Sequence, residues 1–155
     1  LAKKLGSKVP MESQRGYHVN LPDPGIEVRH IMMDTVGKHA ITPMAMGLRL
    51  GGTSEFAGLD TPPNWRRARA IVENAKRIFP TLKTEGYSQW AGDRPLLPDS
   101  LPVIGPSPHR HNVYYAFGHS HIGLALGAVT GRLVADLVAG RTPGIDLHPF
   151  RIDRF

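Results

Sequence analysis

An arginine on a stiffened stretch of backbone is the first residue whose surroundings indicate chemistry. Arg94 lies in the segment 89–99, Gln-Trp-Ala-Gly-Asp-Arg-Pro-Leu-Leu-Pro-Asp, among tryptophan, glycine and proline. Its planar guanidinium can hold a carboxylate by two parallel hydrogen bonds. The segment therefore predicts a site for an amino-acid carboxylate. A structural alternative is that Arg94 pairs with Asp93 or Asp99 and only fastens a loop.

A second candidate site is the segment 114–123, Tyr-Tyr-Ala-Phe-Gly-His-Ser-His-Ile-Gly. Its pattern predicts a strand, a glycine-bounded turn and the start of a helix. Such a junction collects free backbone N–H groups and the positive end of the helix dipole, which suits a phosphate or an electron-rich ring oxygen.

The helix predicted after this turn has one face without side chains. Gly123, Gly127 and Gly131 recur every four residues, and each costs a helix about 1 kcal/mol relative to alanine. A closely approaching flat ligand or a second backbone would offset that cost. Helix-on-helix packing without any cofactor is the alternative.

Other chemistries are poorly supported. No Gly-x-Gly-x-x-Gly turn with a following acidic residue and no Walker lysine is present. Ser54 and Ser120 lack a nucleophile elbow, so a hydrolase is not expected. The pairs 109–111 and 119–121 each hold two histidines, but no carboxylate stands at a matching short spacing, so we predict no metal site.

The elements that must position these residues begin with a predicted antiparallel sheet. A proline- and glycine-rich turn at 22–25 is expected to join strands 17–21 and 27–33 into a hairpin. Further strands are predicted over 38–43 and 46–53, and their tight spacing is typical of an antiparallel sheet.

The second half of the chain predicts two helices and two strands. Apolar residues at three-to-four spacing predict a helix over 65–79, followed by a strand over 82–94. Five prolines within 95–108 indicate a rigid, extended path. A strand over 112–117 and a helix over 122–139 complete the prediction.

The composition fits one globular domain. The chain has 155 residues, of which 41% are hydrophobic and 21% charged, and no cysteine, so disulfides and thiolate sites are excluded. The formal charge is +6, but the basic residues are scattered, which argues against a nucleic-acid or membrane surface. The chain begins with Leu1 and shows no signal core, so we expect it to be cut from a longer protein.

In this order, the motifs resemble the flavin-dependent family that includes D-amino-acid oxidase, D-amino-acid dehydrogenase, glycine oxidase and sarcosine oxidase. The resemblance covers nearly the whole chain and rests on five segments, 15–18, 50–55, 90–95, 102–105 and 118–123.

The resemblance implies an α+β fold in the carboxyl-terminal, substrate-domain portion of such an enzyme. Residues 1–100 would form a substrate-binding antiparallel sheet domain with the helix 65–79 packed on it. Residues 101–155 would supply a strand and a helix that complete an FAD-binding domain. The family's amino-terminal glycine fingerprint is absent. FAD is therefore expected in the full-length parent, held with the amino-terminal FAD-binding segment, and this chain alone is not expected to retain it.

The resemblance also implies the roles of individual residues. The expected catalytic residues are Arg94, Tyr17, His18 and His121. The expected cofactor-binding residues are Gly92, Arg94, Gly118, His119, Ser120, His121, Ile122, Gly123 and Leu124. In this family hydride passes from the substrate carbon to the flavin, and the resulting imine is hydrolysed to a keto acid and ammonia. His121 stands where glycine oxidase has an arginine, so D-amino acids, small amines and secondary amines all stay open as substrates. Ordinary strand packing is the alternative for Tyr17 and His18.

The predicted function is therefore FAD-dependent oxidation of the carbon–nitrogen bond of a D-amino acid or related amine. The protein would be cytoplasmic or peripheral to the inner face of the membrane. The alternatives are a non-catalytic binding or assembly module, including a homo-oligomer formed through the glycine face, and an inert fragment that does not bind FAD alone.

Overall fold

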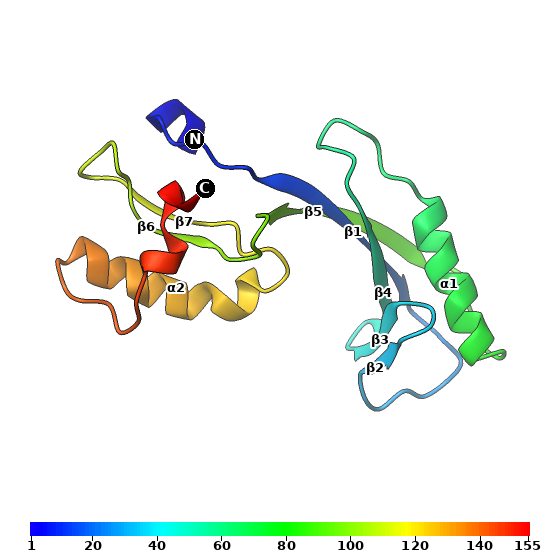
Figure 1. Cartoon of the computed structure of the whole chain (residues 1–155). Coiled ribbons are helices and arrows are strands. Elements are labelled where there is room, and N and C mark those ends of the chain that lie inside the picture. Colours follow the sequence, from blue (N-terminus) through cyan, green and yellow to red (C-terminus); the bar gives the residue numbers. More distant parts are fainter. The chain divides into compact units, whose positions relative to one another are not determined.

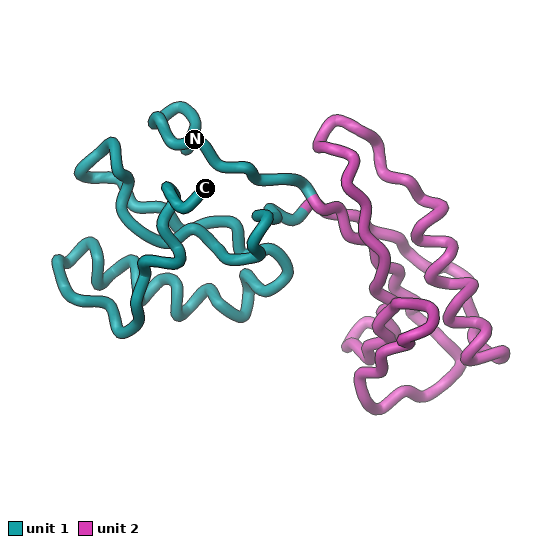
Figure 2. The backbone as a smooth tube through the Cα atoms, viewed as in Figure 1, with its two compact units in different colours: residues 1–13, 94–155 teal, residues 14–93 magenta.

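The computed structural model describes residues 1–155, which fold as two compact units (Figures 1 and 2). Unit 1 comprises residues 1–13 and 94–155, and unit 2 comprises residues 14–93. The predicted α+β class is confirmed, because the chain forms a five-stranded sheet, a two-stranded sheet and two α-helices. The first thirteen residues group with the carboxyl-terminal part, whereas the predicted domains were 1–100 and 101–155. Those boundaries stay a prediction.

The sheet of unit 2 has the strand order β2-β3-β4-β1-β5. Its strands are β1 (Glu12–Leu21), β2 (Met32–Asp34), β3 (His39–Met44), β4 (Gly47–Glu55) and β5 (Ser88–Leu96). The pairs β1–β4, β2–β3 and β3–β4 are antiparallel. The strands predicted over 38–43 and 46–53 correspond to β3 and β4.

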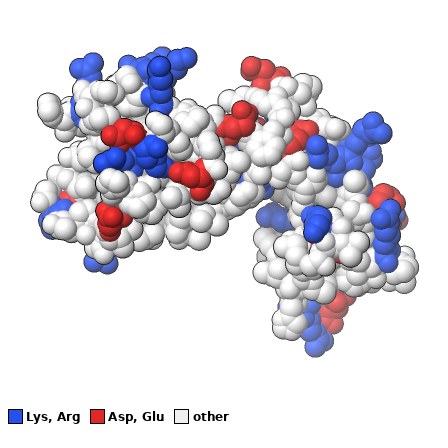
Figure 3. Space-filling view, in the orientation of Figure 1, with Lys and Arg blue, Asp and Glu red and all other residues white.

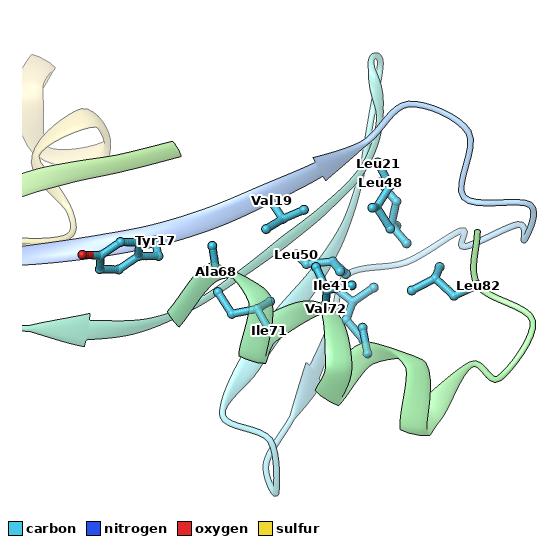
Figure 4. Close-up of a cluster of buried hydrophobic side chains, with 11 residues drawn as sticks. Tyr17, Val19, Leu21, Ile41, Leu48, Leu50, Ala68, Ile71, Val72 and Leu82 are labelled. Carbon is cyan, nitrogen blue, oxygen red and sulfur yellow. The ribbon is translucent and has the colours of Figure 1, made fainter. Parts of the chain in front are cut away.

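One face of this sheet packs against helix α1 (Arg66–Ile78), which confirms the predicted helix. Val19, Leu50 and Ile41 lie side by side on the three central strands and are almost fully buried. Figure 4 shows α1 lying across these residues, with Ile71 among the side chains that close the core. Burying each such side chain contributes about 1.5–3 kcal/mol, so this layer fixes the sheet on which the candidate site is built.

The hairpin expected between 17–21 and 27–33 is wrong. β1 pairs with β4, and β2 pairs with β3. The turn cluster does reverse the chain, but its backbone bonds elsewhere, since the amide of Lys83 donates to the carbonyl of Pro24 at 2.9 Å. Turn residues predict where a chain bends and carry no information about which strand it meets.

Unit 1 is built on a two-stranded antiparallel sheet of β6 (Val103–Pro106) and β7 (Tyr114–Phe117) with helix α2 (Gly123–Val138) beside it. The unit also contains three short 3₁₀ helices, Ala2–Leu5, His148–Phe150 and Ile152–Arg154. Its core residues are Leu97, Val103, Tyr115 and Ile152. β6 lies inside the segment that we expected to be only an extended connection. Its prolines stand next to or at the strand end, where a missing N–H is tolerated.

The carboxyl terminus is fastened to unit 1 by an ion pair. Arg154 donates from Nε to Asp99 at 2.7 Å and from Nη2 to the carbonyl of Leu101 at 2.7 Å. The hydrogen bond from Arg154 holds the pKa of the Asp99 carboxyl below its usual value. A depressed folded-state pKa adds stability that is present above the unfolded pKa and is lost as the pH falls through the folded pKa.

We therefore expect Asp99→Asn to lower the free energy of unfolding at pH 7 and to have less and less effect as the pH falls through the lowered folded-state pKa of the Asp99 carboxyl, where the wild-type carboxyl also becomes protonated. Urea titrations at pH 7 and at lower pH values measure the difference. Asp60→Asn, at an exposed loop position, is the control. Equal destabilisation by Asp99→Asn at all of these pH values would contradict the ion-pair explanation.

The surface charges are mixed in sign. On the face shown in Figure 3, basic and acidic side chains are interspersed and separated by uncharged residues. The net charge of +6 therefore forms no continuous positive surface on that face. Neither α-helix is long and apolar enough to cross a bilayer.

Candidate functional site

The side of the unit 2 sheet that faces away from α1 carries the first group of predicted residues. Side chains alternate along a strand, and in β1 the buried side chains are those of Arg15, Tyr17, Val19 and Leu21, while Gly16, which is also buried, has no side chain. His18 therefore lies on the opposite, uncovered face. Cross-strand pairing continues its row through Gly51, Ala40 and Met33. This row is a shallow strip, because two of its members have no side chain or only a methyl group.

His18 is stacked on Trp90 at one end of this strip. Their ring centroids lie 4.9 Å apart with an interplanar angle of 21°. The indole also covers Gly92, because a Cβ atom at that position would lie 2.0 Å from Cη2 of Trp90. Gly92 was predicted to contact the cofactor, and that role stays a prediction. What the structure shows is that its missing side chain makes room for the tryptophan ring.

Polar groups stand on the same face of β1. The side-chain oxygen of Asn20 accepts a hydrogen bond of 2.9 Å from Nε of Arg49. Gln14 precedes His18 by four residues, so strand alternation places it on this face too. Its Oε1 atom is buried and accepts no hydrogen bond. A buried acceptor without a partner is costly, which marks Gln14 as a position where a donor is missing.

Tyr17 lies on the other side of the sheet from His18. Its hydroxyl donates to Glu55 and accepts from the amide of Asn64 at 2.8 Å, and its ring meets Trp65 edge-on. Burial and the contact with Glu55 raise the pKa of the phenol. The structure thus separates the two neighbours that were both predicted to be catalytic, and a catalytic role for Tyr17 stays a prediction.

A buried charge network beneath Tyr17 was missed by the sequence analysis. Arg15, which is 4% exposed, donates to Asp93 at 3.2 Å and to the carbonyl of Thr61 at 2.7 Å. It also forms an ion pair with Glu55 at 3.5 Å, and Arg67 of α1 reaches the other oxygen of Glu55 at 3.2 Å. The Tyr17 hydroxyl and Arg67 lower the pKa of Glu55. The network ties the sheet to α1 and to the loop after β4.

A bulge places Glu55 in this network. β1 and β4 shift register between Gly16 and Tyr17, and the unmatched residue of β4 is Thr53. Thr53 has a φ of 58°, an uncommon conformation for a β-branched residue. Its hydroxyl accepts a hydrogen bond of 2.8 Å from Arg67. The extra residue keeps Glu55 on the side of α1. The sequence signal that could have revealed this charge network is Arg15, a charged residue at one of the alternating buried positions of β1.

The turn between β7 and α2 in unit 1 has the geometry that the sequence predicted. Gly118 has a φ of 81° and packs against Leu97, so that a Cβ atom would meet the leucine at 2.6 Å. Ser120 has a φ of 53°, and its Oγ atom is buried without a hydrogen-bond partner. No side chain caps the start of α2. The turn therefore presents the N–H groups of an uncapped helix beside an unpaired hydroxyl.

His119 points back onto the helix. Its Nε2 lies 2.9 Å from Oγ1 of Thr130, and burial lowers the pKa of the imidazole. Its Cβ atom fills the space beside Gly123 at 3.2 Å from the position of a Cβ there. His119 is thus held neutral near pH 7 and in a fixed orientation. The side chains of the next predicted residues, His121, Ile122 and Leu124, are exposed.

One face of α2 is bare. No atom lies within 4 Å of a Cβ built at Gly127 or Gly131, and the adjacent Leu124 is 100% exposed. Thr130 and Leu133, on the other side of the helix, are buried. At Gly127 and Gly131 the glycine face is therefore not filled by this chain's own side chains, whereas His119 packs beside Gly123. A helix that is apolar on both sides is typical of one that packs between two layers.

Arg94 is half-buried at the end of β5, and its Nη1 atom is buried without a hydrogen-bond partner. The two carboxylates proposed as structural partners are engaged by other arginines, Asp93 by Arg15 and Asp99 by Arg154. A guanidinium nitrogen removed from water with no acceptor is costly, and an incoming carboxylate would satisfy it.

Unit 1 fits the electron-rich edge of a flavin ring. The uncapped start of α2 and the unpaired hydroxyl of Ser120 offer donors, and the bare glycine face permits close approach of a flat group or of the protein layer that holds it. No group of three or more side chains suited to a metal ion is brought together. The fold and these residues agree with the class expected from the sequence, a flavin-dependent oxidoreductase.

Comparison with known proteins gives the family. The family model described as FAD dependent oxidoreductase, DAO, matches residues 1–137, so the chain belongs to the FAD-dependent oxidoreductase family.

The chain is 40% identical over its whole length to the D-amino-acid oxidase of Bradyrhizobium diazoefficiens and spans 38% of that protein. It is 38% identical to the D-amino acid dehydrogenase of Paramagnetospirillum magneticum and spans 37% of it. It superimposes over its whole length on 42% of the glycine oxidase chain from Geobacillus kaustophilus, with a TM-score of 0.83 and 26% identity. The chain thus spans less than half the length of these proteins.

Proposed function

We propose that the protein containing this chain oxidises the carbon–nitrogen bond of a D-amino acid or a related amine, with FAD as the hydride acceptor. The observation that carries the proposal is the buried, unpaired Nη1 of Arg94, because an amino-acid carboxylate is the ligand that this geometry suits. The similarity to a D-amino-acid oxidase and a D-amino acid dehydrogenase supports the same substrate class.

Each residue has a distinct task in this proposal. Arg94 binds the substrate carboxylate and so orients the reacting carbon. The N–H groups at the start of α2 and the hydroxyl of Ser120 stabilise negative charge at the facing edge of the ring. His119, kept neutral by burial and held by Thr130, keeps the turn in shape. FAD, when bound, would supply the hydride acceptor for the substrate carbon, and this chain supplies no nucleophile.

The substrate would enter as a small molecule, and the protein would act in the cytoplasm or at the inner face of the membrane. The test is oxidation of D-alanine, L-alanine, glycine and sarcosine by the full-length protein with an added electron acceptor, with the oxo acid and the released ammonia (methylamine for sarcosine) both measured. We expect D-alanine to give both products in equal amounts and L-alanine to give neither. Turnover of none of the four compounds by a flavin-loaded protein would overturn the proposal.

The glycine face of α2 provides a second test, because the rival function is a non-catalytic assembly module that uses this face. We expect Gly131→Leu in the full-length protein to lower its FAD content by at least about tenfold, since a large side chain would fill a space that is open in this chain. Arg132→Leu, one residue along the same helix, is the control and should retain FAD. If Gly131→Leu keeps its flavin and only lowers the molecular mass in light scattering, the assembly function is correct.

A further inference from the structure

We propose that the stacked rings of His18 and Trp90 form a wall that selects the side chain of the substrate, and that Gly92 is the positioning residue for this wall. The inference rests on the proposed function and adds to it a determinant for the side chain of the substrate. The substrates it favours are amino acids with large apolar or aromatic side chains.

The sheet of unit 2 leaves one face on which a small molecule can lie. The other face is filled by the core and by α1. On the open face, Gly51 and Ala40 keep the surface low beside His18, and the nearest atom to a Cβ at Gly51 is Cβ of His18 at 3.9 Å. A ligand side chain therefore has a shallow floor to lie on and one raised edge, which is the aromatic stack.

The raised edge depends on the absence of a side chain at position 92. A Cβ there would meet three atoms of the Trp90 ring at 2.0, 2.6 and 2.7 Å, and such distances force the ring to move. The indole in its present place is stacked on His18 at 4.9 Å and keeps 53% of its surface exposed. Gly92 thus sets the position of Trp90, and Trp90 sets the face that a ligand meets. Flat apolar groups are well matched to such a face.

The same face of the sheet also carries a hydrogen-bond acceptor for a polar group of the ligand. Gln14 lies on the same face of β1 as His18, and its buried Oε1 atom accepts no hydrogen bond. The amino group of an amino acid is a donor of the required kind. The wall and this acceptor, which both belong to unit 2, would contact the side chain and the amino group of one amino acid.

The test uses the full-length protein and the pair D-phenylalanine and D-alanine. We expect Trp90→Ala to raise the Michaelis constant for D-phenylalanine by about tenfold, as expected for the loss of one large aromatic contact, and that for D-alanine by less than about twofold. Gly92→Ala should raise the Michaelis constant for D-phenylalanine relative to that for D-alanine, and the double variant should lower this selectivity no further than Trp90→Ala alone, because both changes remove the same wall. Gln89→Ala, at an exposed neighbouring position, is the control.

A structural measurement separates this inference from the proposed function. In wild-type protein, the imidazole protons of His18 should be shifted upfield by the indole and should respond to D-phenylalanine. Gly92→Ala should abolish both effects. If wild type oxidises D-amino acids but Trp90→Ala and Gly92→Ala treat the two substrates alike, the wall is wrong and the function stands. If D-phenylalanine perturbs His18 while no amino acid is oxidised, the wall stands and the function is wrong. If neither is observed, both are overturned.

Discussion

Replacing Arg94 by leucine in the full-length protein is expected to raise the Michaelis constant for a D-amino acid by about 100-fold or more. The guanidinium has a buried nitrogen without a partner, and removal of one member of a buried hydrogen-bonded charge pair costs several kcal/mol. The Michaelis constant of Arg94→Lys should lie between those of wild type and Arg94→Leu, because lysine keeps the positive charge but lacks the planar guanidinium that binds a carboxylate by two hydrogen bonds. Steady-state kinetics with D-alanine measures all three proteins.

Two comparisons keep this prediction specific. Arg110→Leu removes an exposed arginine from the same unit and should leave the Michaelis constant unchanged. A substrate amine without a carboxylate should be oxidised about equally by wild type and Arg94→Leu. Such a substrate makes no carboxylate contact with Arg94, so the variant loses nothing that wild type has. An unchanged Michaelis constant for D-alanine in Arg94→Leu would remove the assignment of Arg94 as the carboxylate ligand.

Replacing Glu55 by glutamine is expected to destabilise the fold by about 2 kcal/mol, because the change removes one of the two negative charges beside the buried Arg15 and leaves Asp93 as its ion-pair partner. Arg67, which is more accessible to water, contributes less to this loss. Urea denaturation followed by circular dichroism measures the free energy of unfolding. Tyr17→Phe removes one hydrogen bond to the same carboxylate and should have a smaller effect.

Glu73→Gln is the matched control for this change. Glu73 lies on the exposed side of α1, so its neutralisation should shift the urea midpoint only slightly. If Glu55→Gln and Glu73→Gln unfold at the same urea concentration as wild type, the charge network does not hold the sheet to α1.

The helices were predictable because their signals are local. A stripe of apolar residues at helical spacing predicts α1, and the same argument predicts α2 from the residues that follow the turn at Gly118. Strand partners are not local. The pairing of β1 with β4 joins residues that are 27 to 40 positions apart, and the hairpin predicted from the turn at 22–25 does not exist. β6 was missed because prolines usually exclude strands, although its prolines stand beside or at the strand end.

The site was predictable in its backbone and less so in its side chains. The turn at Gly118 and the bare face at Gly127 and Gly131 follow from glycine spacing, and the structure leaves that face open. The opposite orientations of Tyr17 and His18 were available from strand alternation alone. The position of the Trp90 ring over Gly92 depends on a side-chain rotamer, which no sequence pattern specifies.

Anaerobic mixing of the flavin-loaded full-length protein with D-alanine tests the central claim most directly. We predict that the visible absorbance of the oxidised flavin disappears within one turnover and returns when an electron acceptor is added. A flavin spectrum that stays unchanged with D-alanine, D-phenylalanine, glycine and sarcosine would contradict the claim that this chain forms the substrate side of an amine-oxidising flavoenzyme.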